Sequence, residues 1–383
     1  MHNLMIKINF KYFFAIICFA VSLPVFSQDF SVLRSNNLSG EIKETSGLLL
    51  INGKLFTHND SGNLPYLYEI DTLTGEINRR IFIQNAHNTD WEDIAQDSNF
   101  VYIGDIGNNL GDRTDLCIYR ISKNQLLQND TVIVTDTITY SYSDQNDFSP
   151  QDQNTAFDAE ALIAFGDSLY VFSKNWSENN TKYYAIPKNA KNYRANPSCV
   201  FLTQGMITGA DILAGQNKIA LVGYNSVLLG FVYILSGFND SSFFSGIQSF
   251  YNISDSIGIN QIEGIAFTGD NKLYVSAEEF DYTYNGNNYT VSPKLLQIKI
   301  SEYNGINKLK SHQCIKIYPN PASEYINVDA GMEKSNIQIF DLYGHVVLQQ
   351  NINKRITKIN ITFLSKGVYM LKVNSVNKMF VKM

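Results

Sequence analysis

Asp90-Trp91-Glu92-Asp93-Ile94 is followed closely by Phe100-Val101-Tyr102-Ile103-Gly104-Asp105 and then by the polar stretch Ile106-Gly107-Asn108-Asn109. The first segment predicts an acidic turn that enters a β-strand. The second predicts a strand that ends in a Gly/Asn loop. Together they predict an antiparallel hairpin whose acidic and amide side chains gather at one end.

Weaker copies of this arrangement recur along the chain. They begin at Ser46, Glu92, Glu160, Ala210 and Glu263, and each is followed by a short β-rich run. Repeats of this length with several strands each are typical of β-propellers. We therefore predict an all-β chain in which residues 28–300 form a five-bladed β-propeller. The long interval between Glu92 and Glu160 leaves room for a sixth blade.

The predicted repeats contain only strands and turns. The last repeat lacks a fourth strand, whereas Phe30–Leu33 has no partner at the other end. Pairing this first strand with the last repeat would close the ring and remove both free sheet edges. A fourth strand of the third repeat is predicted at Ser198–Thr203.

The composition limits the classes of protein to consider. The chain has 383 residues, of which 44% are hydrophobic and 17% charged, so it can form a large core and is not disordered. A net charge of −6 disfavours nucleic acid and anionic membrane faces as partners. No apolar stretch after the N-terminal region is long enough to predict a transmembrane segment. We expect a monomer.

The N-terminal residues 1–27 predict a signal peptide, because Lys7 and Lys11 precede an apolar run and a cleavage-permissive segment. The protein is therefore expected to be exported. The other cysteines are Cys117, Cys199 and Cys314. Unpaired thiols are favoured over a metal site, and an oxidising compartment permits a Cys117–Cys199 disulfide.

The C-terminal residues 314–383 follow a polar linker, residues 301–313, and predict about seven short strands in a small immunoglobulin-like β-sandwich. Three blocks, Tyr318-Pro319-Asn320-Pro321, Ile339-Phe340-Asp341-Leu342-Tyr343-Gly344 and Leu364-Ser365-Lys366-Gly367-Val368-Tyr369, resemble the C-terminal sorting domain of type IX secretion substrates. The resemblance implies a Bacteroidetes-type source, the type IX secretion machinery as partner, and a secreted protein that is either attached to the cell surface or released.

The larger domain resembles the phytase-like and esterase-like secreted propellers. The likeness lies in an acidic and a small residue before the inner strand, as in Ile262-Glu263-Gly264-Ile265. This likeness concerns the shape of the repeat rather than a catalytic motif, and it indicates no particular substrate.

Equivalent positions of a propeller converge on its axis, so the acidic turns predict a metal site. The candidate ligands are Glu92, Asp93, Glu160 and Glu263, with Ser46 and Ala210 completing the ring. Carboxylates brought together repel unless they are protonated or share a cation, and Ca²⁺ prefers oxygen ligands. The alternative is that each Glu accepts backbone hydrogen bonds at its turn.

The loops after the second strands supply a second set of candidates, for ligand binding: His58, Asp60, Asp105, Asn108, Asn109 and Lys174. Ordinary turns also explain Asn, Asp and Gly in such loops. We predict a propeller that binds an extracellular ligand, with Ca²⁺ in support. The alternative is a phytase-like, metal-dependent phosphoesterase or esterase in which Asp105 or His58 helps to activate water.

Overall fold

The computed structural model describes residues 30–189, 191–301, 315–330, 335–342, 344–354, 356–373 and 376–383. The signal-peptide prediction and all of the predicted linker after Ser301 lie outside these residues. The chain divides into two compact units, a larger one that holds most of residues 30–301 and a smaller one at the C-terminus. Strands dominate both, which confirms the predicted all-β class. No helix among the described residues is long and apolar enough to cross a membrane.

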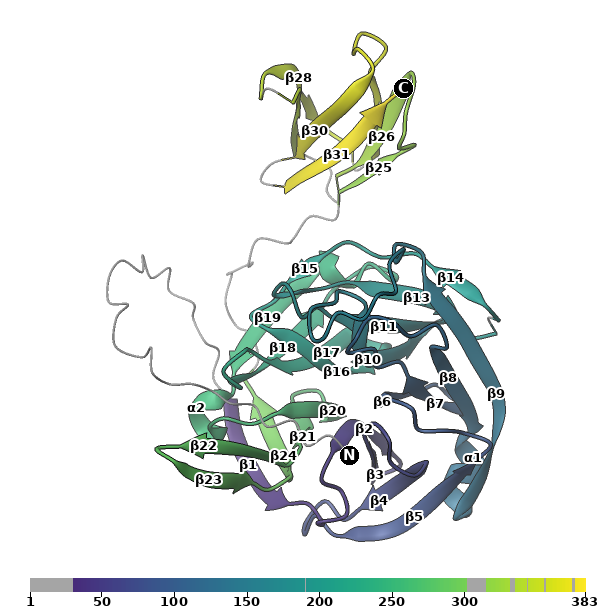
Figure 1. Ribbon diagram of the computed structural model, residues 1–383, viewed down its shortest axis with the longest axis vertical. Helices are drawn as coiled ribbons and strands as arrows, with labels where there is room; N and C mark the ends of the chain where they lie inside the picture. Colours follow the sequence, from purple (N-terminus) through teal and green to yellow (C-terminus); the bar gives the residue numbers. More distant parts are fainter. Residues whose placement is uncertain are drawn as a thin grey trace. The chain divides into compact units, whose positions relative to one another are not determined.

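The larger unit is built on five inner strands. These are β2 (Thr45–Ile51), β6 (Trp91–Gln96), β10 (Asp158–Phe165), β16 (Met206–Leu213) and β20 (Ile262–Gly269). Each contacts the next in that order, and β20 contacts β2, so the inner strands form a ring (Figure 1). The arrangement is propeller-like.

Each inner strand starts an antiparallel sheet that runs outward. The second strands are β3 (Lys54–Asn59), β7 (Phe100–Asp105), β11 (Ser168–Lys174), β17 (Lys218–Tyr224) and β21 (Lys272–Ala277). The third strands are β4 (Tyr66–Ile70), β8 (Cys117–Ser122), β13 (Tyr183–Pro187), β18 (Gly230–Ser236) and β24 (Lys294–Ile300). Outer strands are β5 (Ile77–Gln84), β9 (Thr131–Tyr142) and β19 (Ile247–Asn252). A short parallel pairing of β5 with β9 joins the first two sheets.

The N-terminal strand completes the last sheet. β1 (Phe30–Asn37) pairs antiparallel with β24, so that Phe30 lies opposite Ile300 and Asn37 opposite Lys294. This confirms the predicted closure by the first strand. The two ends of the larger unit are thereby held in one sheet, and β24 has a strand on each side.

Several elements differ from the prediction. The third sheet has no long outer strand; instead β12 (Asn180–Thr181) pairs with β15 (Phe201–Leu202), and β14 (Tyr193–Ala195) pairs with β9. Short helices α1 (Lys123–Gln128) and α2 (Ser254–Ile257), 3₁₀ turns η2 (Ala214–Gln216) and η3 (Phe243–Ser245), and a hairpin of β22 (Phe280–Tyr284) and β23 (Asn287–Val291) were not predicted. Cys199 is disulfide-bonded whereas Cys117 is free and buried, so the Cys117–Cys199 pairing is wrong.

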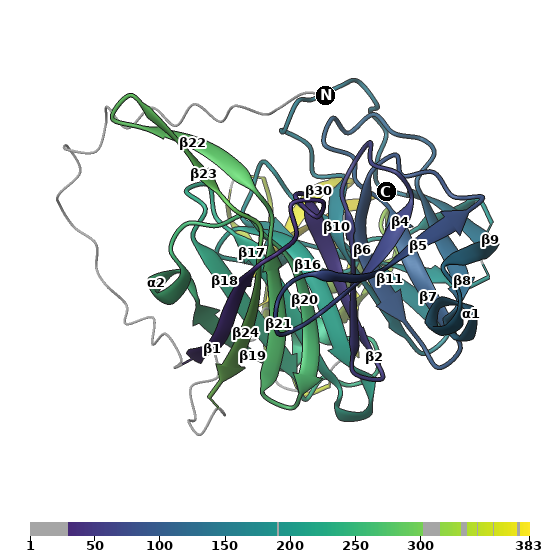
Figure 2. The same ribbon diagram turned by 90° about the horizontal axis from the view of Figure 1, so that it is seen from below.

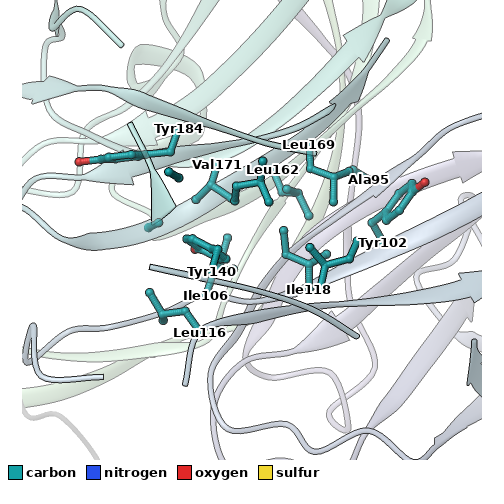
Figure 3. Packing of buried hydrophobic residues seen from close by; sticks show 14 of the residues in the cluster. Ala95, Tyr102, Ile106, Leu116, Ile118, Tyr140, Leu162, Leu169, Val171 and Tyr184 are labelled. Atoms are coloured by element: carbon teal, nitrogen blue, oxygen red, sulfur yellow. The ribbon is translucent and has the colours of Figure 1, made fainter. Parts of the chain in front are cut away.

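The core lies between neighbouring sheets. Successive residues of a strand point to opposite faces of its sheet, and both faces of the second sheet are packed: Val101 and Ile103 face the first sheet and Tyr102 faces the third. Between the second and third sheets, Tyr102 and Ile118 face Leu162, Leu169 and other buried side chains (Figure 3). Similar clusters fill the space between the first and second sheets and between the fourth and fifth.

A β-bulge interrupts each inner strand close to its start. The register shifts at Glu92, Glu160, Thr208 and Glu263, and at Ser46–Gly47 in β2. A bulge leaves one residue unpaired and changes the direction of its side chain. The repeated acidic turn of the sequence is therefore a repeated bulge.

One buried carboxylate connects three inner strands. Asp93 accepts hydrogen bonds from the backbone amides of Ile94 (2.8 Å), Leu162 on β10 (2.7 Å) and Ala210 on β16 (3.1 Å). Asp211 makes the corresponding bonds to Ile212 and, on β20, to Phe267. These amides belong to the inner strands, which are the edge strands of their sheets and have no ladder partner on one side.

The smaller unit consists of two sheets around one core. β25 (Lys316–Tyr318), β26 (Tyr325–Asp329) and β29 (Ile356–Asn360) form the first sheet, and β28 (Val346–Ile352), β27 (Ser335–Phe340), β30 (Gly367–Val373) and β31 (Val376–Lys382) form the second. Buried side chains of both sheets, such as Ile326, Ile339 and Leu371, pack together. The predicted strands of this region are present.

We predict that Asp93→Ala lowers the free energy of unfolding by about 3 kcal/mol or more, because it leaves three buried amides without an acceptor. Urea unfolding followed by tryptophan fluorescence measures the loss. Asp167→Ala is the matched control, since Asp167 is exposed at the β10–β11 turn, and it should change stability by less than about 0.5 kcal/mol. Equal effects of the two changes would contradict the role given to Asp93.

Candidate functional site

Six carboxyl groups gather where the inner strands begin and the second strands end. We call them the acidic cluster: Asp60, Asp90, Glu92, Glu160, Glu263 and Glu278. The bulges supply Glu92, Glu160 and Glu263. Asp60 and Glu278 directly follow β3 and β21, and Asp90 directly precedes β6. The ring of inner strands thus brings together residues that lie more than 200 positions apart.

Three members of the cluster form a group with the geometry of a cation site. One carboxylate oxygen each from Asp60, Asp90 and Glu92 lies within 4.8 Å of the other two. Glu92 is only 3% exposed, and its Oε1 atom has no hydrogen-bond partner among the described residues. Asp60 and Asp90 are half-buried, so the group is reached from solvent on their side.

Gly107 provides the space beside this group. A Cβ atom added at Gly107 would lie 2.2 Å from Glu92 Oε1 and 2.4 Å from Asp90 Oδ2. Both distances are far shorter than a van der Waals contact, so only glycine fits without displacing the two carboxylates. The unpartnered oxygen of Glu92 and the oxygen of Asp90 therefore converge on the same small volume.

The other half of the cluster contains one cation. Lys174 is buried and donates a hydrogen bond to Glu160 Oε1, while its Nζ lies 4.4 Å from the centre of the Trp176 ring. Its Nζ is also 3.5 Å from the hydroxyl of Tyr224, and Tyr224 in turn hydrogen-bonds Glu263. Glu160 Oε2 has no partner among the described residues.

Burial and mutual repulsion raise the pKa of these carboxyl groups. Desolvation is the largest cause throughout, followed for Asp60 by the charge of Asp90 and for Glu92 by the charge of Asp60. The pKa of Asp90 rises to about 7 and that of Glu263 to about 8, although Lys174 opposes both shifts. Burial alone would lower the pKa of Lys174, but the negative charge of Glu160 beside it raises that pKa. The cluster therefore contains more carboxyl groups than can be ionised together unless a further cation binds among them.

The structure separates Asp93 from the other predicted metal ligands. Glu92, Glu160 and Glu263 belong to the acidic cluster, whereas both carboxylate oxygens of Asp93 accept backbone amides between the inner strands. Asp93 therefore connects inner strands through its carboxylate rather than joining the acidic cluster.

His58 lies in the core rather than at the cluster. Its ring makes an edge contact with Trp91 at 5.7 Å, and its Nδ1 atom is 3.1 Å from the carbonyl oxygen of Asn59. Burial lowers the pKa of His58 to about 4, so the imidazole is neutral. None of the acidic side chains contributes to that shift.

The remaining predicted ligand residues hold loops in place. Asp105 forms an ion pair with Arg113 at 2.8 Å and accepts the backbone amide of Asp90. The side-chain amide of Asn108 donates to the carbonyl of Phe157, and its backbone amide donates to the carboxylate of Asp158. The backbone carbonyl of Asn109 accepts the amide of Gln153. These contacts position Asp90 and the loop of Gly107. Of the six residues, Asp60 and Lys174 lie at the cluster itself.

In the fourth repeat, the residue equivalent to Glu92 lies two positions earlier than the sequence predicts. The bulge falls at Thr208, and its hydroxyl donates to the carbonyl of Ile262, so Thr208 rather than Ala210 is equivalent to Glu92. The pairs Ser46-Gly47, Thr208-Gly209 and Glu263-Gly264 share a small second residue, and this was the available signal. Gly107 and Trp176 were not recognised, because their roles depend on contacts between different loops.

Comparison with known protein families identifies the C-terminal region. Residues 316–383 match the family described as the secretion system C-terminal sorting domain. This confirms the resemblance seen in the sequence, and it marks the chain as a secreted, cell-surface protein handled by type IX secretion. No curated protein matches the chain.

Solved structures with distant similarity cover most of the chain. Glutaminyl cyclase of Myxococcus xanthus is 12% identical with a TM-score of 0.44, covering 71% of this chain and 97% of its own. Exo-β-1,3-galactanase of Phanerochaete chrysosporium is 9% identical with a TM-score of 0.40, covering 88% and 94%. PorZ of Porphyromonas gingivalis, a surface component of the type IX secretion system, is 12% identical with a TM-score of 0.32, covering 88% and 45%. Similarity at this level says nothing about activity, which must be argued from the residues above.

The raised carboxyl pKa values predict that the cation-free protein loses stability as the pH rises. Folded carboxyls keep protons that the unfolded chain releases above its ordinary pKa near 4, so their contribution is full at low pH and is lost as the pH passes the folded values. Those values are about 7 for Asp90 and about 8 for Glu263. Between about pH 6.5 and about pH 8.5 in chelator, the free energy of unfolding should fall by roughly 1 kcal/mol or more.

This pH window avoids the opposite effect of His58. The imidazole is buried neutral, so its contribution increases with pH only up to its ordinary pKa of about 6.5. Denaturant midpoints at the two pH values measure the change. Glu263→Gln should flatten the dependence, whereas Glu76→Gln, in the β4–β5 turn, should leave it unaltered. Stability that is constant or rising over this window would contradict the crowding of ionisable carboxyls.

Proposed function

We propose that residues 30–300 form a five-bladed β-propeller that binds an extracellular ligand at the acidic cluster, supported by a Ca²⁺ ion held by Asp60, Asp90 and Glu92. The observation that carries the proposal is the buried, unpartnered Oε1 atom of Glu92 within the group of three carboxylates. An ionised oxygen without a partner is costly in a buried site, and a cation removes that cost.

The proposed blade number follows from the sheets. Each of the five inner strands begins its own antiparallel sheet, and β1 supplies the outer strand of the last one. The interval between Glu92 and Glu160 that left room for a sixth blade is taken up by β7, β8, α1, β9 and the loop that follows them. For the smaller unit we propose the immunoglobulin-like type of sandwich, because its two antiparallel sheets enclose one core.

Calcium fits the residues better than metals that prefer thiolate or imidazole ligands. The candidate ligands are all oxygen atoms, which suit hard cations, and no cysteine or histidine accompanies them. The half-buried positions of Asp60 and Asp90 leave room for water to complete the six to eight ligands that Ca²⁺ takes. An extracellular protein can use a site of modest affinity, since such modules bind Ca²⁺ at about 10⁻⁴–10⁻³ M.

A metal-dependent hydrolase of phosphoesters or esters is the competing function. One observation favours it: Asp60 and Asp90 are half-buried, so a water molecule bound to the proposed cation would be open to a substrate on their side. The base assigned from the sequence would have been Asp105 or His58. However, Asp105 is paired with Arg113 and His58 is buried against Trp91.

We predict that the mature full-length protein binds Ca²⁺ in calorimetry and gains thermal stability from it. Asp60→Asn should weaken binding at least about tenfold, because it removes one of three charged ligands. Gly107→Ala should weaken it similarly by displacing Glu92 and Asp90. The controls are Glu76→Gln and Gly40→Ala; a Cβ atom at Gly40 meets nothing within 4 Å.

The same protein distinguishes the two functions. Release of phosphate or of an ester product that stops on chelation and in Asp60→Asn would establish the hydrolase. Absence of turnover across a broad panel, with Ca²⁺ binding intact, would leave the binding function. Failure to detect Ca²⁺ binding or any effect of chelator on melting would refute the metal in both.

For the C-terminal unit, we predict that removal of residues 316–383 stops export across the outer membrane. The truncated protein should collect in the periplasm, because the region that matches the sorting family is gone. Cell fractionation and surface protease digestion measure its location, and trypsin resistance of the periplasmic form measures folding. Normal surface display of the truncated protein would refute the sorting role.

A further inference from the structure

Four exposed apolar side chains lie on loops at the same end of the sheets as the acidic cluster. Val227 and Leu229 belong to the β17–β18 loop, Ile259 to the β19–β20 loop and Tyr289 to β23. They are 50%, 39%, 37% and 42% exposed, respectively. We call these four residues the apolar patch. Large apolar side chains exposed together on a secreted protein are typical of an interaction surface.

The segments that carry the patch are tied to each other. Leu229 and Ile259 form a β-bridge, and the amide of Asn260 donates to the carbonyl of Leu228. Leu228 packs against Phe280 of the β22–β23 hairpin, and on that hairpin the rings of Tyr282 and Tyr289 stack at 5.2 Å. Figure 2 shows the hairpin projecting beyond the sheets at this end.

The apolar patch borders one half of the acidic cluster. Tyr224 packs in the same small core as Leu228 and Phe280, and its hydroxyl bonds Glu263. Glu278 is partly exposed, lies two residues before Phe280, and accepts a hydrogen bond from Gln261. A ligand that covers the patch therefore reaches Glu278 and, behind it, the half of the cluster around Lys174.

This half of the cluster contains more carboxyl groups than its one internal cation can neutralise. Glu160, Glu263 and Glu278 face a single cation, Lys174, and Glu160 Oε2 is buried with no partner among the described residues. A Ca²⁺ ion held by Asp60, Asp90 and Glu92 would neutralise the other half and leave this excess in place. A second positive group would match it.

We infer that the extracellular ligand is a polypeptide segment in which a lysine or arginine side chain, directed at Glu278, is flanked by apolar or aromatic residues that cover Val227, Leu229, Ile259 and Tyr289. This deepens the proposed function and rests on it. The charge of the cluster selects the basic group, and the patch selects its neighbours. An anionic membrane face does not fit, since the carboxylates would repel it, and a neutral sugar supplies no cation.

The experiment measures fluorescence anisotropy of labelled peptides with the mature full-length protein in Ca²⁺. The probes are Gly-Phe-Arg-Leu-Gly, the uncharged Gly-Phe-Gln-Leu-Gly, and Gly-Ser-Arg-Ser-Gly without apolar neighbours. The first should bind saturably, at least about tenfold more tightly than either of the others. Equal binding of the glutamine peptide, or no saturable binding of the arginine peptide below about 1 mM, would overturn the inference.

Matched variants locate the binding. Glu278→Gln should weaken the arginine peptide about tenfold, whereas Glu279→Gln should not, because Glu279 pairs with Lys43. Val227→Ser should weaken it several-fold, whereas Leu73→Ser, exposed in the β4–β5 turn, should not. Peptide binding that is lost equally in all four variants would refute this site. Size-exclusion chromatography with the unlabelled peptide tests whether the patch is instead covered by a second copy, in which case the peptide would dissociate a dimer and the inference would fail.

Asp60→Asn separates this inference from the proposed function. Loss of Ca²⁺ binding with retained arginine-peptide binding would show that the peptide site stands beside an independent cation site. If wild-type protein binds no Ca²⁺ and the arginine peptide still binds, the metal proposal fails and the peptide site stands. If Ca²⁺ binds and the peptide does not, only the peptide site fails.

Discussion

The β-bulge near the start of each inner strand is the constraint on which the rest of the structure depends. An unbroken strand would alternate its side chains regularly between the two faces of its sheet. The bulge inserts a residue, so that Glu92, Glu160 and Glu263 leave the sheet packing and meet one another from different sheets. Asp93 and Asp211 accept backbone amides from the open edges of neighbouring inner strands. The bulges therefore position the acidic cluster, while these two aspartates hold neighbouring inner strands together.

The acidic cluster is a poor solution for stability alone. Buried carboxyls that repel one another raise the free energy of the folded chain unless they hold protons or a cation, and two of the oxygens have no partner among the described residues. Asp93 shows that the same fold can surround a buried carboxyl group with three amide donors, although burial still raises its pKa. Local conflict of this kind, set beside a well-satisfied neighbour, is typical of a functional site.

The amino-acid sequence predicts the features of this fold that depend on local pattern. Strand positions, closure by β1, and the convergence of Glu92, Glu160 and Glu263 follow from alternation and from spacing. The spacing of the repeats does not distinguish Asp93 from Glu92. Adjacent residues at a bulge point in different directions, and the sequence does not reveal which of the two faces the acidic cluster. The sequence also predicted His58 at the binding face. In the structure His58 lies before Asn59, the last residue of β3, and its ring packs on Trp91. The β22–β23 hairpin was not predicted, although Asn285-Gly286 between two aromatic segments is a hairpin signal that the sequence offered.

Lys174 divides the cluster into two halves with different chemistry. Its ammonium group is internal, is held by Glu160 and lies over Trp176, so that half is partly neutralised in every state of the protein. The half with Asp60, Asp90 and Glu92 has no such cation among the contacts of the described residues, so its carboxyl groups repel one another unless they hold protons or the proposed Ca²⁺ ion. A small ion can reach it past the half-buried aspartates. The Lys174 half instead opens toward Glu278 and the exposed apolar side chains, where a larger basic ligand has surface to cover. One crowded group of carboxylates can therefore serve an ion and a ligand without competition between them.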